Sequence, residues 1–433
     1  MKKTLLLLIA ILSLQLTYSQ TQKKFELYAV AEGNFGTPNG DLFKVTNLSA
    51  TIIQEGPLYQ NANSGATGFD VLQDFQIVGD KAVLLSKSSG FRVVVANYPS
   101  LTHVQTFTGL GAPQTLSKGG ENKAYLSSSN PNKIFQINLE TNTTTVVSDP
   151  DNTITAVSNY MTFANGYVYA AISSKIVKID PNTNAVVATI LPNLGTISGL
   201  EFDESNNSLW VLGKVAATSA LKKINVINND LMDEAITLTG VTNALYLRYA
   251  DHKLYFLSGK NVHIYSIDAP NIPTASLYTS TLTGSWDFAY GKAFHVDPIS
   301  GDFVFGSASA FTSGSKYEIV DGTTFEMIAT GTITNCIGVN EFILKTEKTL
   351  GVETPEISEI IVYPNPASDV ITFKVRENQY TISIYNQIGN LIKSVDSKYE
   401  EYRLDVSDLP TGIYFAQIMT QNKAVTTKKI IIK

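Results

Sequence analysis

The sequence predicts an all-β protein in which a seven-bladed β-propeller precedes a small immunoglobulin-like β-sandwich. Three observations lead to this fold. The 433 residues include 21 Tyr and 20 Phe among many Thr, Val and Ile, a composition typical of strands and tight turns. A unit of four short strand-like segments recurs along most of the chain. A different alternating pattern fills about the last 75 residues.

Residues 1–20 are predicted to form a signal peptide. Two lysines are followed by a mostly apolar run from Leu5 to Leu14 and then by small or polar residues, so we expect cleavage near Ser19 or Gln20. The alternative, a membrane anchor, is disfavoured because the run is too short to span a bilayer comfortably. We expect no membrane span after cleavage. No cysteine lies near the cleavage site, so attachment of a lipid there is excluded.

Residues 25–345 repeat one unit of four strands. The clearest copy contains "APQTLSKG", "KAYLSSS", "KIFQINL" and "TTTVVSD" between Ala112 and Asp149. A four-stranded unit with a period of 41 to 50 residues is typical of a β-propeller. The second strands of successive units are marked by Val83, Tyr125, Tyr169, Trp210, Tyr255 and Phe305.

The two ends of this region complete one blade together. Residues 26–59 supply three strands, and residues 334–344 supply one unmatched strand. We therefore expect residues 334–344 to pair with residues 26–33. This pairing closes a ring of seven blades and removes the free sheet edges that would favour aggregation.

Long connections gather on one face of the expected ring. Neighbouring strands of a blade alternate in direction, so connections between second and third strands share a face with connections between blades. Nearly all long connections belong to this set, and the opposite face carries tight turns. Because rigid scaffolds usually carry function on such loops, we expect this long-loop face to bind a ligand. The long loops are residues 32–40, 58–68, 214–219, 281–290 and 307–315.

Aromatic and amide side chains on this face are the candidate ligand contacts. Flat rings among Asn, Gln, Ser and Thr donors suit a large, partly polar ligand. An aspartate on an inner strand near the axial channel is added to them. The candidates are Asn34, Phe35, Tyr59, Asn61, Asp74, Trp286 and Phe311.

Patterns that mark catalysis or metal binding are absent from the sequence. The histidines, His103, His252, His263 and His295, have no metal-ligand spacing, and no "HExxH", "GxSxG" or phosphate loop occurs. Acidic turns such as "DPNTN" are explained by turn geometry, so we expect no metal. Cys336, the one cysteine, is expected to be a buried, unreactive thiol. A net charge of -6 without a basic block argues against nucleic acid.

Three motifs in the propeller region carry a family resemblance: "AEGNFGTPNGDLFKV", "GATGFDVLQDFQIVGDKAVLLSKSSGFRVVVA" and "HVDPISGDFVFGSASAFTSGSKYEIVD". Through them the region resembles YncE-like propellers and, more closely, Bacteroidetes surface propellers of the BtuG cobalamin-binding type. The resemblance implies cobalamin as a ligand and an outer-membrane TonB-dependent transporter as a partner. Two departures stand against it. Those propellers are typically lipoproteins, and the usual glycine-proline ending of the last blade is replaced by "TNCIGVN" in this chain.

Residues 359–433, which follow a linker at 346–358, form a separate domain. Alternating apolar positions, among them Ile382 and Ile384, predict a small antiparallel sandwich. The stretches "YPNPASD", "YNQIGNLI" and "LPTGIYFAQI" are similar to the type A sorting domain of the type IX secretion system. This resemblance implies export by the type IX machinery to the cell surface or the extracellular space. The alternative is a generic immunoglobulin-like adhesion module.

Together these patterns predict a secreted, cell-surface binding protein that is not an enzyme and has no resident cofactor, with cobalamin as the candidate ligand. Two alternatives from other classes stay open: a propeller enzyme of the lactonase or glycan lyase type, and a surface adhesin. An enzyme would gather carboxylates or metal ligands at the channel mouth, whereas a binding protein would present aromatic and amide side chains there.

Overall fold

The computed structural model describes residues 23–33, 36–47, 51–88, 92–215, 218–270, 275–282, 293–308, 314–334, 336–346, 360–375, 379–386, 390–420 and 425–433. The chain divides into two compact units, Met1–Lys348 and Thr349–Lys433. In the described part of the chain, no helix combines the length and the apolar character needed to cross a membrane.

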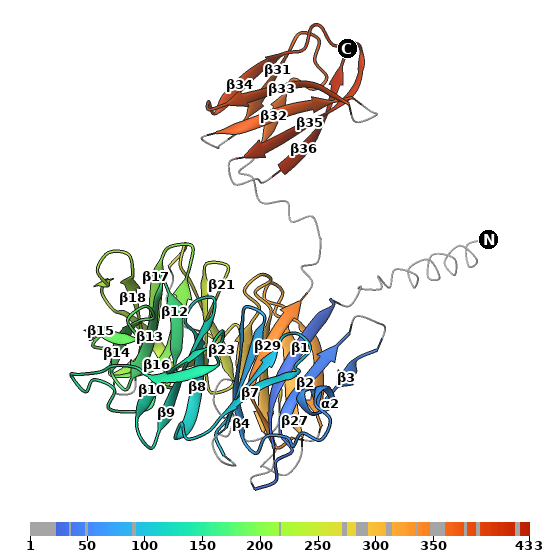
Figure 1. The fold of residues 1–433 in the computed structure, drawn as a ribbon. Coiled ribbons are helices and arrows are strands. Elements are labelled where there is room, and N and C mark those ends of the chain that lie inside the picture. The colour runs from blue at the N-terminus through green and yellow to red at the C-terminus, as the bar shows by residue number, and fades with distance from the viewer. Residues whose placement is uncertain are drawn as a thin grey trace. The chain divides into compact units, whose positions relative to one another are not determined.

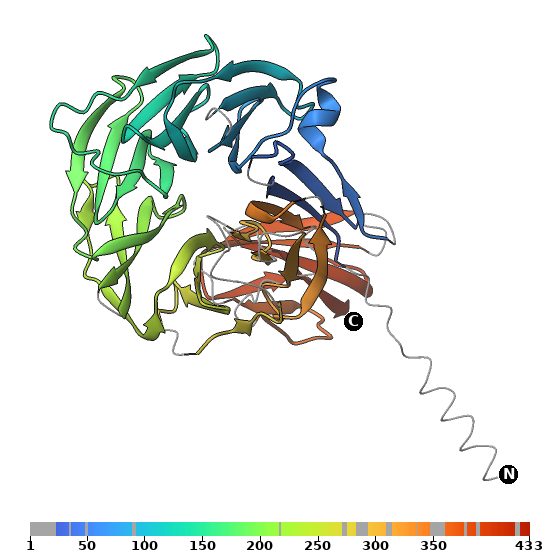
Figure 2. The same ribbon diagram turned by 90° about the horizontal axis from the view of Figure 1, so that it is seen from below.

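Seven sheets, counted over the described residues, form the first unit, and they are set around a common axis (Figures 1 and 2). From the innermost strand outward, the first blade contains β29 (Gly338–Thr346), β1 (Phe25–Glu32), β2 (Asp41–Thr46) and β3 (Ile53–Glu55). The second blade contains β4 (Leu72–Val78), β5 (Lys81–Ser86), β6 (Val93–Asn97) and β7 (His103–Phe107). The third blade contains β8 (Ala112–Lys118), β9 (Lys123–Ser129), β10 (Lys133–Asn138) and β11 (Thr143–Val146). The fourth blade contains β12 (Met161–Ala164), β13 (Tyr167–Ile172), β14 (Lys175–Asp180) and β15 (Ala185–Ile190). The fifth blade contains β16 (Thr196–Asp203), β17 (Ser208–Val215), β18 (Thr218–Asn225), β19 (Leu231–Met232) and β20 (Ile236–Thr242). The sixth blade contains β21 (Leu245–Ala250), β22 (Lys253–Ser258), β23 (Asn261–Ser266) and β24 (Tyr278–Thr279). The seventh blade contains β25 (Phe294–Val296), β26 (Phe303–Ala308), β27 (Ser315–Val320) and β28 (Met327–Ile333).

The predicted seven-bladed propeller is confirmed, and its core lies between successive blades. All six residues that marked the repeat lie in second strands and are at most 3% exposed. One apolar cluster, for example, joins Val83 and Val95 of the second blade to Leu126 and Ile137 of the third. Trp210 packs between the fifth and sixth blades, as its place in a strand pattern predicted. Each blade is therefore stabilised chiefly by apolar area buried against its two neighbours.

The first blade is assembled from both ends of the propeller. Strand β29 pairs with β1 in antiparallel register, from Phe25 opposite Thr346 to Glu32 opposite Gly338. β29 begins at Gly338, four residues later than the sequence pattern indicated. The apolar cluster at this joint contains residues of β1, β29 and the seventh blade, so the ring closes through packing as well as through strand pairing.

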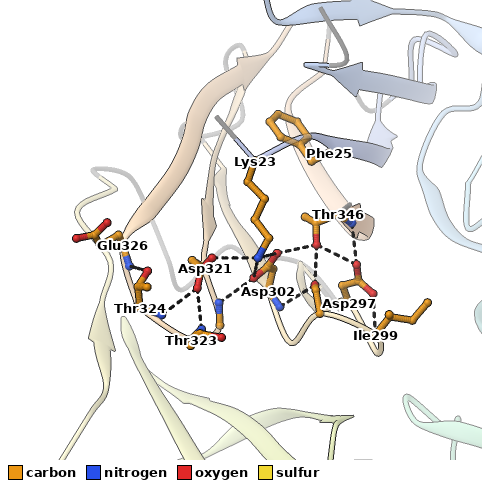
Figure 3. Close-up of polar contacts among 12 residues, drawn as sticks. Lys23, Phe25, Asp297, Ile299, Asp302, Asp321, Thr323, Thr324, Glu326 and Thr346 are labelled. Carbon is orange, nitrogen blue, oxygen red and sulfur yellow. Dashed lines mark hydrogen bonds and ion pairs between the residues drawn. The ribbon is translucent and has the colours of Figure 1, made fainter. Parts of the chain in front are cut away.

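A polar cluster, which we call the ring latch, adds a second closure (Figure 3). It consists of Lys23, Asp297, Asp302, Asp321 and Thr346. The Lys23 ammonium lies 2.6 Å from Asp302 and 3.0 Å from Asp321, both in the seventh blade. The Thr346 hydroxyl donates to Asp302 at 2.6 Å, and its backbone N–H donates to Asp297 at 2.7 Å. The latch therefore ties residues from the two ends of the propeller to one blade.

Two local features differ from the predicted strands and loops. Part of the loop predicted at 58–68 is a short helix, α2 (Leu58–Ala62). The buried carboxylate of Asp41, on β2, accepts the backbone N–H groups of Tyr59 at 2.7 Å and of Gln60 at 3.1 Å, so a residue distant in sequence caps the first turn. The fourth strand of the fifth blade is divided into β19 and β20, which pair with opposite ends of β18.

The second unit is a β-sandwich of two antiparallel sheets. They are β30 (Ile361–Tyr363), β31 (Val370–Lys374) and β34 (Glu401–Asp405), and β33 (Leu391–Ser397), β32 (Tyr380–Tyr385), β35 (Gly412–Thr420) and β36 (Val425–Ile432). Ile382 and Ile384, two of the predicted alternating positions, are buried in its core together with Tyr414, Ala416 and Ile418. Ile388, predicted to continue the alternation, lies outside the described residues.

Candidate functional site

Side chains from all seven innermost strands line a cavity of about 750 Å³, which therefore lies on the propeller axis. This volume falls within the range of cavities that hold small-molecule ligands. One lining residue from each strand, in the order β4, β8, β12, β16, β21, β25 and β29, is Gln76, Ser117, Thr162, Glu201, Arg248, His295 and Glu341. We call this space the axial cavity.

Arg248 is held at the wall of the axial cavity by contacts to two neighbouring blades. Its Nη1 lies 3.1 Å from Oε1 of Glu201, and its Nε donates to the carbonyl of Phe294 at 2.9 Å. A bulge between Leu245 and Arg248 shifts the register of β21 against β22, and such bulges re-aim the side chains beside them. The guanidinium consequently joins three neighbouring blades at the cavity wall.

His295 contributes a neutral ring to the same wall. Burial, together with the nearby positive charge of Arg248, lowers the pKa of His295 to about 3, so the imidazole carries no charge at neutral pH. Its Nδ1 accepts the backbone N–H of Leu344 at 3.1 Å, which places the ring hydrogen on Nε2. The ring is therefore available as a hydrogen-bond donor rather than as a cation.

The axial cavity extends toward the face with the tight turns. Innermost strands of a propeller run in one direction, and Ile77, Lys118, Tyr249 and Lys345 lie at the carboxyl ends of theirs. Lys118 and Lys345 are exposed there, and neither forms an ion pair among the described residues. The predicted ligand face was the opposite one, so the structure adds a candidate site that the loop lengths did not indicate.

A second cavity of about 500 Å³ lies at the amino ends of β16 and β21, on the long-loop side of the ring. It is lined by Asn159, Tyr160, Thr196, Ile197, Ser198, Lys214 and Leu245, and we call it the upper cavity. Tyr160 lines the axial cavity as well. The two spaces therefore share a wall.

The predicted contact residues are distributed in two groups. Asn34, Phe35, Trp286 and Phe311 lie outside the described residues. The other three are described, and none of them lines either cavity.

Tyr59, in α2, packs its ring on Phe69 and is 4% exposed, because apolar contact favours the core over the surface. Asn61 is exposed at the end of the same helix. The buried carboxylate of Asp74 accepts the backbone N–H groups of Phe75 and of Leu116, both at 2.8 Å, and so joins β4 to the next innermost strand. These bonds make Asp74 a positioning residue of the scaffold.

The described ends of two long loops are fastened to each other. Gly40 and Phe69 exchange backbone hydrogen bonds of 2.6 and 2.8 Å, and Asp70 accepts the N–H of Gly36 at 2.8 Å. Arg92 stacks over the Phe69 ring at 4.6 Å and donates to the carbonyl of Gly68. The flanks of the loop at 32–40 are therefore part of a rigid joint between the first two blades.

The charged lining of the axial cavity was not predicted from the sequence. Glu201, Arg248 and Glu341 each stand inside a predominantly apolar strand, as in "LYLRYA". A charged residue inside the innermost strand of a blade faces either the core or the axis, and burial of its charge in the core would be costly. That signal could have placed these residues in the channel.

No group of three or more His, Cys, Asp or Glu side chains is arranged to hold a metal ion in the part of the chain that the structure describes. Cys336 is 3% exposed and lies in the apolar cluster at the ring joint.

We expect Cys336 to be unreactive in the folded protein. Burial raises the pKa of its thiol to about 12, and the thiolate is the reactive species. At pH 8 a chromogenic disulfide reagent should label no thiol in the native protein and one thiol per chain in denaturant, since the sequence contains a single cysteine. Rapid labelling of one thiol in native protein would contradict this expectation.

Comparisons with known proteins match both units. A family model described as "Domain of unknown function (DUF5074)" matches residues 26–345, and one described as "Secretion system C-terminal sorting domain" matches residues 361–433. No curated protein matches the chain.

Three solved structures are similar to the chain at low identity. A quinoprotein alcohol dehydrogenase-like protein of Bacteroides thetaiotaomicron is 13% identical with a TM-score of 0.56, and the match covers 74% of this chain and 78% of that one. PorZ, a surface component of the type IX secretion system of Porphyromonas gingivalis, is 12% identical with a TM-score of 0.45 over 91% of this chain. The chain spans 63% of the PorZ chain's length. Hydrazine synthase of Kuenenia stuttgartiensis is 11% identical with a TM-score of 0.42, and the match covers 60% of this chain and 80% of that one. At these identities the first of the three supports the fold alone.

The match to a secretion sorting domain indicates the destination of the protein, which is exported to the cell surface or the extracellular space.

Proposed function

Because the chain belongs to the family described as "Domain of unknown function (DUF5074)" and ends in a secretion sorting domain, we propose that it is an exported, non-enzymatic protein that binds a small molecule in the axial cavity. One observation carries this proposal: all seven blades contribute side chains to a single cavity of about 750 Å³. A propeller ring leaves a channel on its axis, and in this ring charged, amide and aromatic side chains converge on that space.

The chemistry of the lining supports binding rather than catalysis. The Arg248 guanidinium and the Glu201 carboxylate are engaged with each other, and His295 is neutral, so these groups present hydrogen bonds more than reactive charge. Phe163 and Tyr249 add aromatic surface beside Gln76 and Thr162. Aromatic rings mixed with a few directed polar groups are typical of sites that hold a ligand without transforming it.

Cobalamin is the ligand that the family resemblance implied, and binding experiments can test it beside smaller ligands. A corrinoid with its nucleotide loop is larger than the drug-sized molecules that a cavity of this volume encloses. Cobalamin would therefore bind on the long-loop face, to which the sequence pattern assigns Phe35, Trp286 and Phe311. Delivery to an outer-membrane TonB-dependent transporter belongs to that version of the proposal.

We expect that filling the axial cavity weakens binding of its ligand. The mature chain, residues 21–433, would be screened by thermal shift and calorimetric titration against cyanocobalamin and against neutral and acidic saccharides. Thr162→Trp places a bulky ring in the cavity and should weaken binding of a cavity ligand by at least about tenfold. Thr189→Trp, the same change on the exposed outer strand β15 of the same blade, is the matched control.

The outcomes separate the proposals. Loss of binding in Thr162→Trp but not in Thr189→Trp supports the axial site. Binding of cyanocobalamin that Thr162→Trp leaves unchanged would place the ligand on the long-loop face and overturn the axial site. Turnover of a bound saccharide, followed by chromatography of the products, would overturn the assignment as a non-enzymatic protein.

A further inference from the structure

The upper cavity contains a buried hydroxyl that has no hydrogen-bond partner among the described residues. Ser198 is 5% exposed, and its Oγ makes no hydrogen bond within the described part of the molecule, although it lines the cavity. Nearly all buried polar side chains in native proteins have a hydrogen-bond partner, so each exception needs an explanation. A ligand group that bonds to Ser198 supplies one.

The fold places this hydroxyl through a β-bulge. The register of β16 against β17 shifts between Ile197 and Gly199, and Ser198 is the extra residue of the bulge. At Gly199 a Cβ atom would lie 2.4 Å from that of Leu247, so the glycine permits the close approach of β16 to β21. Bulges of this kind often direct a side chain into a functional site.

Lys214 lines the same cavity as the Ser198 hydroxyl. It pairs with Thr196 across β16 and β17, is exposed, and forms no ion pair among the described residues. Thr196, Asn159 and Tyr160 complete the polar lining of the upper cavity. A cation, two hydroxyl groups, an amide and a phenol in one pocket match the carboxylate and hydroxyl groups of an acidic sugar.

The charges of the two cavities point to an anion. Their described lining contains four cationic side chains and two carboxylates, while the whole chain has a net charge of -6. The cationic residues are Lys118, Lys214, Arg248 and Lys345, and the carboxylates are those of Glu201 and Glu341. An excess of positive charge inside a concave site on an acidic protein raises the local concentration of small anions.

We propose that the upper and axial cavities form one site for an acidic saccharide, with a carboxylate bound by Lys214 and Ser198 and the remaining rings extending past Tyr160 into the axial cavity. This inference rests on the proposed function, because it names the ligand class of the same channel. Tyr160 lines both spaces and offers a sugar ring an aromatic face. Entry is from the long-loop face, where the upper cavity lies.

The test compares an acidic saccharide with its uncharged form. Calorimetric titration of the mature chain with digalacturonate and with its methyl ester should show at least about tenfold tighter binding of the acid, with affinity falling as salt is added. Lys214→Met should remove this preference. Lys175→Met is the matched control, because Lys175 begins β14 on the same side of the ring and lines neither cavity.

A second variant separates binding from folding. Ser198→Ala should weaken digalacturonate binding about fivefold. The thermal midpoint of the ligand-free protein should stay unchanged, because the hydroxyl bonds to no group among the described residues. Equal affinity for the acid and its ester would overturn the inference, as would failure of digalacturonate to bind while another probe binds in the channel. In either case the proposed function stands if Thr162→Trp blocks the probe that binds. If no probe binds, both fail.

Discussion

Replacing Asp302 with alanine is expected to lower the free energy of unfolding of the propeller by about 3–5 kcal/mol, the usual cost of removing one partner from a buried ion pair. The Asp302 carboxylate is fully buried and accepts hydrogen bonds from three different donors. Lys23 approaches from the chain's N-terminal side, the Thr346 hydroxyl from the end of β29, and the Gly322 N–H, at 2.9 Å, from the turn after β27. Removal of the carboxylate leaves all three donors without this acceptor.

The ring latch has a large effect because of its place in the topology. The chain connects every pair of neighbouring blades covalently, including the seventh and the first, because β28 leads directly to β29. The non-covalent closure lies inside the first blade, where β29 pairs with β1, and the apolar cluster and the latch reinforce it (Figure 3). Loosening that joint exposes strand edges, and exposed edges favour association with other chains. We therefore expect the Asp302 variant to aggregate on heating at a lower temperature than the unchanged protein.

Urea unfolding, followed by tryptophan fluorescence, measures this prediction. Asp80→Ala is the control, because Asp80 pairs with Lys81 on the surface and its removal should leave the midpoint unchanged. Lys23→Met should cost less than Asp302→Ala, since the Thr346 and Gly322 donors to Asp302 survive. A midpoint for Asp302→Ala equal to that of Asp80→Ala would show that the latch does not stabilise the ring.

The latch should also respond to pH in a defined direction. Burial opposes ionisation of Asp321, but the N–H groups of Thr324 and Thr323 and the Lys23 ammonium outweigh it and lower the pKa. A lowered pKa contributes stability above the ordinary value of 3.8, and the contribution is lost as pH falls through the folded value. For Lys23, burial lowers the pKa, but its bonds to Asp302 and Asp321 raise it overall, so its contribution is lost only at alkaline pH. The difference between the unchanged protein and Lys23→Met should therefore shrink in acid.

The sequence was sufficient for the architecture because the propeller repeat is a pattern of local apolar positions. Tyr125, Tyr169 and Tyr255 mark equivalent strands, and each packs against a neighbouring blade. Features that depend on contacts distant in sequence were missed. The first turn of α2 is capped by Asp41, 18 residues away from Tyr59, so no local signal could reveal it. The division of the outer strand into β19 and β20 likewise depends on pairing, because the two strands pair with opposite ends of β18.

The candidate site was harder to predict for a related reason. Loop length is visible in a sequence, and it directed attention to the long-loop face. The axial cavity is lined by isolated residues from seven separate strands, such as Glu201, Arg248 and His295, which the ring brings together. Ser198 and Arg248 are further directed by bulges, and a bulge leaves no clear mark in the sequence.

Deleting residues 349–433 is expected to abolish export to the cell surface while leaving the propeller folded. The division of the chain lies between Lys348 and Thr349, and each unit has an apolar core built from its own strands. We therefore expect the propeller to fold without the sorting domain. Without the sorting domain the chain lacks the segment that the type IX machinery engages, and it should accumulate inside the cell. Surface labelling of intact cells and fractionation would measure both effects, and the thermal midpoint of the truncated protein should match that of the propeller in the full chain.

A pair of point variants asks whether the machinery needs the folded sandwich or only its sequence. Ile382 and Ser383 are neighbours on β32, but Ile382 is fully buried and Ser383 faces outward, where its hydroxyl meets that of Ser394. Ile382→Asp places a charge in the core and should unfold the domain, because an unpaired carboxylate cannot be satisfied there. Ser383→Asp adds the same charge to the outer face and should leave the domain folded.

If recognition requires the sandwich, Ile382→Asp loses surface export as the deletion does, and Ser383→Asp retains it. The domain of Ile382→Asp could instead be unfolded while the protein is exported at the normal level. That result would mean that the machinery recognises an extended segment of the domain. The role of the fold would then be to protect that segment before export.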